Sequence, residues 1–77
     1  MKFIKGFETE VARISLIRGT DFRAYYVCVV GLADDNEHDV IKEFASIEEA
    51  SSWYSAIYAV LVCNNVKIIK HFIGEIA

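Results

Sequence analysis

Apolar and polar positions alternate through the first half of the chain, and in the second half apolar positions recur at intervals of three and four. Alternation places successive side chains on opposite faces of a strand, whereas the longer spacing is that of a helix. The alternating half is also rich in aromatic and β-branched residues. It predicts four strands, at residues 2–7, 11–18, 22–32 and 39–44.

Residues 46–65 predict an amphipathic helix. Ser46 is placed to accept a hydrogen bond from an exposed N–H of the first turn, and Glu48 and Glu49 favour the positive end of the helix dipole. Asn64 and Asn65 suit the end of the helix, because asparagine tolerates the left-handed conformation found there. The residues expected to face the core are Ile47, Ala50, Tyr54, Ile57 and Leu61, with Trp53 beside them.

The last segment, residues 66–76, fits two interpretations. Ile69, Phe72, Ile73 and Ile76 recur at helical spacing, whereas the β-branched run that begins at Val66 favours a strand. We predict a second helix here, because adjacent isoleucines interrupt strand alternation. The expected fold is a single α+β domain over residues 1–77, a four-stranded antiparallel sheet with two antiparallel helices on one face (ββββαα).

The alternation also assigns faces to the strands. Phe3 and Phe7 are predicted to face the core from the first strand, and Gly19 is expected to supply a positive φ in the turn after the second. The remaining core positions are expected to be Ala12, Ile14, Leu16, Phe22, Ala24, Tyr26, Cys28 and Val30. The opposite face would then carry Val11, Arg13, Ser15, Ile17, Arg23, Tyr25, Val27 and Val29.

Composition excludes several classes of protein. The chain has 77 residues, of which 55% are hydrophobic. It is therefore long enough for one core and too apolar for a disordered segment. A net charge of −3 lacks the basic footprint of a protein that binds nucleic acid directly. No signal-peptide pattern opens the chain, and its longest apolar run, residues 56–63, is too short to cross a membrane. We therefore expect a soluble protein of the cytoplasm.

No motif predicts an enzyme, a metal site or a cofactor. The acidic stretch 34–39 lacks the spacing of a calcium loop, and His38 has no partner nearby for a zinc site. Cys28 and Cys63 lie in apolar runs and are expected to be buried and reduced. An alternative interpretation is a stacking platform for single-stranded nucleic acid, formed by Arg13, Arg23 and Tyr25. The net negative charge of the chain and the lack of an aromatic row disfavour this interpretation.

The candidate functional site is the sheet face that the helices leave uncovered. Several apolar residues on adjacent strands, with a tyrosine and two arginines, indicate a surface that binds protein. A second copy in a homodimer is the other occupant that this pattern allows. The predicted partner-binding residues are Glu10, Arg13, Ser15, Ile17, Arg23, Tyr25, Val27 and Val29.

Two short motifs resemble one known family. They are Met1-Lys2-Phe3-Ile4-Lys5 and Phe44-x-Ser46-x-Glu48-x-x-x-Ser52-Trp53, followed by Tyr54. Both are similar to segments of the small phage-encoded anti-CRISPR proteins that inhibit the type I-F surveillance (Cascade-like) complex. That family has four antiparallel strands and two helices, and its outer sheet face binds the backbone subunits of the RNA-guided complex, where target DNA would otherwise be held.

The resemblance implies an inhibitor that blocks recognition of target DNA by a type I CRISPR effector complex. This sequence departs from the family at Gly6, where the family carries a binding tyrosine. Tyr25 is a candidate replacement by its face, and Glu8, Glu10 and Asp21 are candidates by charge. The alternative is a small homodimeric module with a structural or regulatory role in a phage or bacterium.

Overall fold

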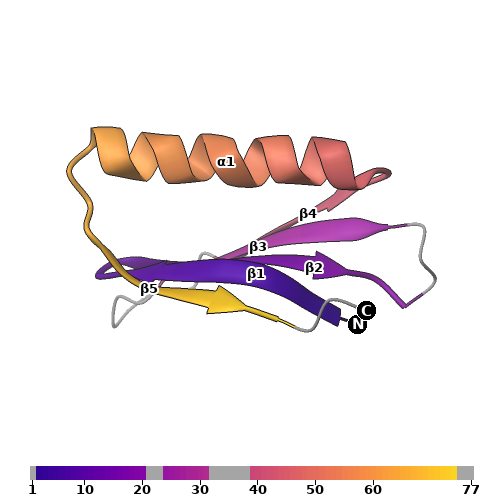
Figure 1. The fold of residues 1–77 in the computed structure, drawn as a ribbon. Helices are drawn as coiled ribbons and strands as arrows, with labels where there is room; N and C mark the ends of the chain where they lie inside the picture. The colour runs from indigo at the N-terminus through magenta and orange to yellow at the C-terminus, as the bar shows by residue number, and fades with distance from the viewer. Residues whose placement is uncertain (1, 21–23, 32–38, 75–77) are drawn as a thin grey trace.

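One α-helix packs across one face of a five-stranded antiparallel sheet (Figure 1). The computed structural model describes residues 2–20, 24–31 and 39–74. The strands lie in the order β4-β3-β2-β1-β5, so that β4 and β5 form the two edges. The elements are β1 (Lys2–Thr9), β2 (Ala12–Arg18), β3 (Tyr25–Gly31), β4 (Val40–Phe44), α1 (Ile47–Cys63) and β5 (Ile68–Ile73).

Helix α1 begins and ends where the sequence predicts. The Ser46 hydroxyl accepts a hydrogen bond from the Glu49 N–H at 3.2 Å. This bond satisfies one of the free donors of the first turn. At the other end Asn65 adopts a φ of 63°, in the left-handed region, and the Val66 N–H donates to the Leu61 carbonyl at 2.9 Å. The helix boundaries therefore follow from local hydrogen bonding.

The core lies between α1 and the inner face of the sheet, which is the face toward the helix. Phe7 is its centre, because this fully buried ring meets the rings of Tyr54 and Tyr58 nearly at right angles, at 5.4 and 5.1 Å between centroids. Burial raises the pKa of the Tyr54 hydroxyl, and the neighbouring Tyr58 raises it further. The other buried members of the cluster are Ile14, Leu16, Val27, Phe44 and Ala50.

Trp53 of α1 reaches toward edge strand β4. Its ring lies 5.9 Å from the ring of Phe44, and the ammonium of Lys42 stands 4.9 Å above it. Lys42 pairs with the core residue Val27, so its side chain projects to the helix side of the sheet. A cation therefore stands over an aromatic ring at this edge of the core.

The predicted second helix is wrong, because residues 68–73 form strand β5. β5 pairs antiparallel with β1, with Phe7 opposite His71 and Gly6 opposite Phe72. The β-branched run that begins at Val66 suits a strand, and the pairing satisfies the outward N–H and C=O groups of β1. The layout is therefore ββββαβ, and the α+β class with an antiparallel sheet covered by helix on one face is confirmed.

The predicted faces of β3 are reversed. Val27 is fully buried, and Tyr25 and Val29 pack against the core beside it. Val27 lies opposite Leu16 of β2, and residues directly opposite in a sheet share a face. β3 is apolar on both sides, so its own pattern does not set its register. A shift of one residue moves every side chain of the strand to the other face of the sheet. Tyr26, Cys28 and Val30 therefore leave the predicted core.

The prediction that Phe3 faces the core is also wrong. The pairing of β1 with β2 shifts between Phe3 and Lys5, and this bulge changes the phase of the alternation. Phe3 therefore lies opposite Ile17 on the outer face, whereas Phe7 enters the core as predicted. The Phe3 ring covers Gly6, where a Cβ atom would lie 3.0 Å from the ring and 2.6 Å from the Ile14 carbonyl oxygen.

The hairpin turns are closed by hydrogen bonds. Buried Thr9 accepts from the N–H groups of Val11 and Ala12 at 3.1 and 3.0 Å, and its hydroxyl donates to the Ala12 carbonyl. In the next turn the Gly19 N–H donates to the Ala24 carbonyl at 2.8 Å. Gly19 does not adopt the predicted positive φ, and among the described glycines none does.

Candidate functional site

The candidate site is the outer face, which is the side of the sheet away from α1. Strand pairing assigns its members, because residues directly opposite one another point the same way. Ile17 is opposite both Phe3 and Tyr26, and Ser15 is opposite both Gly6 and Cys28. The outer face consists of Phe3, Gly6, Glu8, Arg13, Ser15, Ile17, Tyr26, Cys28, Val30, Ile41, Glu43, Lys70 and Phe72.

Apolar side chains cross the outer face from β4 to β1. Ile41 is 67% exposed and Val30 38% exposed, while Tyr26, Cys28 and Ile17 are half-buried by their neighbours. These residues are contiguous in the sheet and belong to three adjacent strands, and Phe3 extends the series to β1. An exposed apolar surface that continues over adjacent strands is typical of a binding site.

The β5 side of the outer face is aromatic and charged. The Arg13 guanidinium donates twice to Oε1 of Glu8, from Nε at 3.0 Å and from Nη2 at 2.8 Å. The Phe72 ring lies 5.8 Å from that guanidinium and 5.1 Å from the Lys70 ammonium. The Arg13 side chain is 54% exposed. The ion pair therefore adds little stability and chiefly orients the guanidinium.

A shallow hollow lies beside this charged group. Phe3, Arg13, Phe72 and Ile73 line it, and its volume is about 310 Å³. The rings of Phe3 and Phe72 meet edge to face at 83°, with centroids 6.5 Å apart. Aromatic and arginine side chains are enriched where proteins contact one another.

The structure divides the predicted site residues. Arg13, Ser15 and Ile17 lie on the outer face, and their part in binding stays a prediction. Tyr25, Val27 and Val29 lie on the helix side, so the prediction that places them on the outer face is wrong. Glu10 is exposed in the turn between β1 and β2, and Arg23 lies outside the described residues.

Several outer-face residues are missed by sequence reasoning. The alternation predicts Tyr26 and Cys28 in the core, and the helical spacing predicts Phe72 on a helix. Ile41 belongs to the strand predicted at residues 39–44, but its 67% exposure on the outer face is not predicted. The available signal was the β-branched composition of the last segment, which places Phe72 on a strand.

The two cysteines differ in exposure. Both are free, as predicted, but Cys63 is exposed at the end of α1, and the prediction that both are buried is therefore wrong. Cys28 lies half-buried on the outer face, and burial raises the pKa of its thiol. Less of the reactive thiolate is therefore present at a given pH.

We expect iodoacetamide to label Cys63 faster than Cys28 at pH 8, because Cys63 is the more exposed thiol. The measurement is peptide mass spectrometry over a time course, and Cys28→Ser and Cys63→Ser variants identify each product. Equal rates for the two thiols in the folded protein would contradict the placement of Cys28. Raising the pH is expected to accelerate labelling of Cys28, because its raised pKa leaves more thiol to ionise.

The described residues contain neither a metal-ligand cluster nor a membrane-spanning helix. Across 2–20, 24–31 and 39–74, no three histidine, cysteine or acidic side chains gather where they would hold a metal ion. Over the same residues no helix has the length and apolar character needed to cross a membrane.

The comparisons with known proteins identified no relative of this chain. Comparison with protein-family models, with curated proteins and with solved structures gave no match.

Proposed function

We propose that this protein is an inhibitor that binds a type I CRISPR surveillance complex through its outer face and blocks recognition of target DNA. The observation that carries the proposal is the contiguous apolar surface from Ile41 to Phe3, uncovered on the side opposite α1. Burying such a surface against a partner removes apolar area from water, which is the main driving force of association.

The charges of the outer face favour a protein over nucleic acid as the direct partner. Arg13 and Lys70 are balanced there by Glu8 and Glu43, and Arg13 is already paired with Glu8. Binding to single-stranded nucleic acid depends on an excess of cations along the groove that follows the phosphates. An apolar centre with a balanced charged rim matches the usual anatomy of a protein interface.

The choice of target rests on the resemblance to anti-CRISPR proteins. The Ser46 cap and Trp53, which carry part of that resemblance, sit in α1 behind the sheet. Gly6, where the family has a binding tyrosine, lies under the Phe3 ring, so the aromatic contacts must come from other positions. Phe3, Tyr26 and Phe72 supply such rings on the outer face.

Co-purification tests this proposal directly. The tagged protein is incubated with purified type I-F, I-E and I-C surveillance complexes, and the captured complex is then offered labelled target DNA. We expect capture of one subtype and loss of its DNA binding, with iodoacetamide labelling of Cys28 suppressed in the complex. Failure to capture any of them, or capture that leaves DNA binding unchanged, would overturn the proposal.

A further inference from the structure

We infer that two copies of this chain associate through α1, with the outer faces of both copies turned away from the contact. This inference stands apart from the proposed function, because it concerns the opposite side of the molecule. It starts from the solvent side of α1, which carries no charge beyond its first turn.

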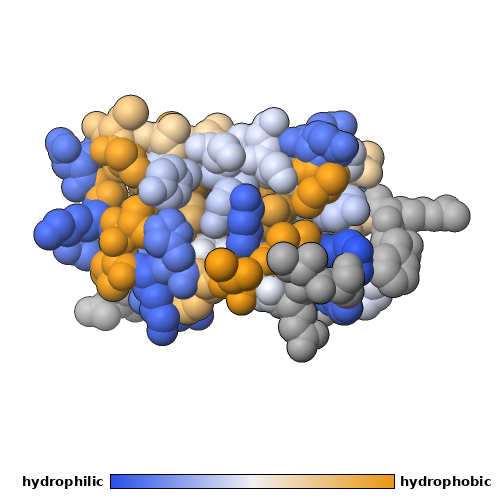
Figure 2. Space-filling model, viewed as in Figure 1, coloured by the Kyte–Doolittle hydropathy of each residue, from blue (hydrophilic) through white to orange (hydrophobic). Residues whose placement is uncertain are grey.

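The exposed positions of α1 after Glu49 are all small or apolar. Val60 is 58% exposed and Val62 46% exposed, in a chain of which 25% of the residues are charged. Figure 2 shows pale to orange residues over α1 between hydrophilic residues at its two ends. The full set is Ser52, Ser55, Ala56, Ala59, Val60, Val62 and Cys63.

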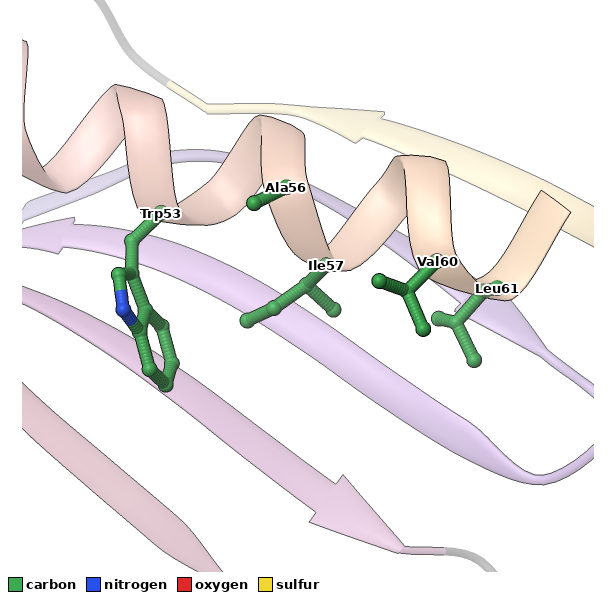
Figure 3. A pocket seen from close by; sticks show the side chains of 5 residues that line it. All are labelled: Trp53, Ala56, Ile57, Val60 and Leu61. Atoms are coloured by element: carbon green, nitrogen blue, oxygen red, sulfur yellow. The ribbon is translucent and has the colours of Figure 1, made fainter. Parts of the chain in front are cut away.

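A groove continues this uncharged surface along one flank of the helix. Trp53, Ile57, Val60 and Leu61 project on the same side, with Ala56 between them (Figure 3). The five side chains line a groove of about 360 Å³. Five strands spaced at about 4.8 Å make a sheet about 24 Å wide, whereas a helix is about 10 Å across. One helix therefore does not cover the whole inner face of the sheet.

The charges of the chain favour a second copy as the occupant. Each copy carries a net charge of −3, so two copies approach with least repulsion where neither presents a charge. Homodimer interfaces are also more apolar than other protein contacts. A membrane surface is disfavoured, because α1 has no lysine or arginine to meet anionic lipids.

The outer face is the less suitable surface for self-association. Its middle strand is β2, and a twofold axis along that strand would stack Arg13 on its own copy. Like charges opposed in this way destabilise a contact. The two apolar surfaces of the molecule therefore have different occupants, a copy of the chain at α1 and a different protein at the outer face.

The area available predicts a weak dimer. Helix α1 has 17 residues. It is therefore about 25 Å long, and with its groove it offers a strip about 15–20 Å wide. About 400–500 Å² per copy is below the roughly 800 Å² per partner of a standard stable interface. The dimer should therefore form in the micromolar range or above, and its population should rise with concentration.

Sedimentation equilibrium from about 5 to about 500 μM tests the inference. We expect the mass to rise from the monomer's 8.7 kDa toward twice that value. Val60→Glu should raise the dissociation constant by about 100-fold, because each copy then presents a charge at the contact. Ile41→Glu on the outer face is the matched control and should leave the constant within about twofold.

Charge reversal separates a contact at Val60 from a folding defect. Val60→Glu and Val60→Lys should each be monomeric, whereas their mixture should form a heterodimer, because the new charges are then opposite. Circular dichroism checks that both variants are folded. A wild type that stays monomeric over the whole range, a mixture that stays monomeric, or a dimer lost in Ile41→Glu but kept in Val60→Glu would overturn the inference.

Discussion

Val27→Asp is expected to unfold the protein, whereas Val30→Asp is expected to leave it folded. Val27 is fully buried in the core opposite Leu16, and Val30 is 38% exposed on the outer face of the same strand. Val27→Asp should lower the free energy of unfolding by about 4 kcal/mol or more, because packing is lost and an unpaired charge is buried. A single core of this size supplies about 3–5 kcal/mol in total, so little or no folded protein should remain.

Urea titration and thermal melts followed by circular dichroism measure this difference. Val30 lies opposite Arg13, so an aspartate there gains a cationic neighbour. Its effect on the unfolding free energy should be about 0.5 kcal/mol or less, as for most surface substitutions. A larger destabilisation by Val30→Asp than by Val27→Asp would mean that the inner and outer faces of β3 are assigned the wrong way round, and equal destabilisation would mean that both faces are buried. Substitutions of Val27 are therefore unsuitable for testing partner binding, because any loss of binding would reflect a loss of the fold.

Tyr26→Ala and Ile41→Lys are each expected to weaken partner binding by about 30-fold or more. Tyr26 is an aromatic side chain of the outer face, opposite Ile17 and Glu43, and Ile41 is the most exposed apolar side chain of that face. Truncating an aromatic contact that is buried against a partner commonly costs about 2 kcal/mol or more, and a lysine buried at the contact would lack a matched acid. Calorimetry with the captured surveillance complex measures both affinities.

Val11→Lys is the matched control for the charge that Ile41→Lys adds. Val11 is 53% exposed in the turn between β1 and β2, outside the outer face. The control should bind within about twofold of the wild type, since surface changes away from a contact have small effects. If Val11→Lys weakens binding as much as Ile41→Lys, the effect is one of net charge and the outer face is not the contact surface.

Local chemistry explains why α1 is predictable from the sequence. Its start depends on the Ser46 hydroxyl and its end on the left-handed Asn65, and both are determined by neighbours close in the chain.

The last segment is not predictable in this way. Residues 66–76 carry helical spacing and strand composition together, and the choice is made by pairing with β1, at the opposite end of the chain. Single-sequence patterns carry no information on such a distant partner.

The candidate site is predictable only where a strand has one polar face. β2 alternates clearly, with buried Ile14 and Leu16 on one side, so Arg13, Ser15 and Ile17 are placed correctly. β3 is apolar on both sides, and only its pairing with β2 shows which side is buried.

The bulge in β1 hides part of the outer face in the same way. It reverses the alternation after Phe3, and nothing in the spacing of that strand marks the extra residue. The outer face as a location follows from the sequence, whereas most of its members follow only from strand pairing.

Lys42 also affects whether the edge strands of two copies of this protein can pair with each other. Strand β4 leaves one row of its backbone groups open at the side of the sheet, as any edge strand does. Lys42 projects inward there, over the Trp53 ring. A strand added at that edge would press its own side chains against the ammonium and strip it of water. In a chain so rich in apolar residues, an inward cation on an edge strand opposes the growth of a continuous sheet from molecule to molecule, which is the first step toward fibres.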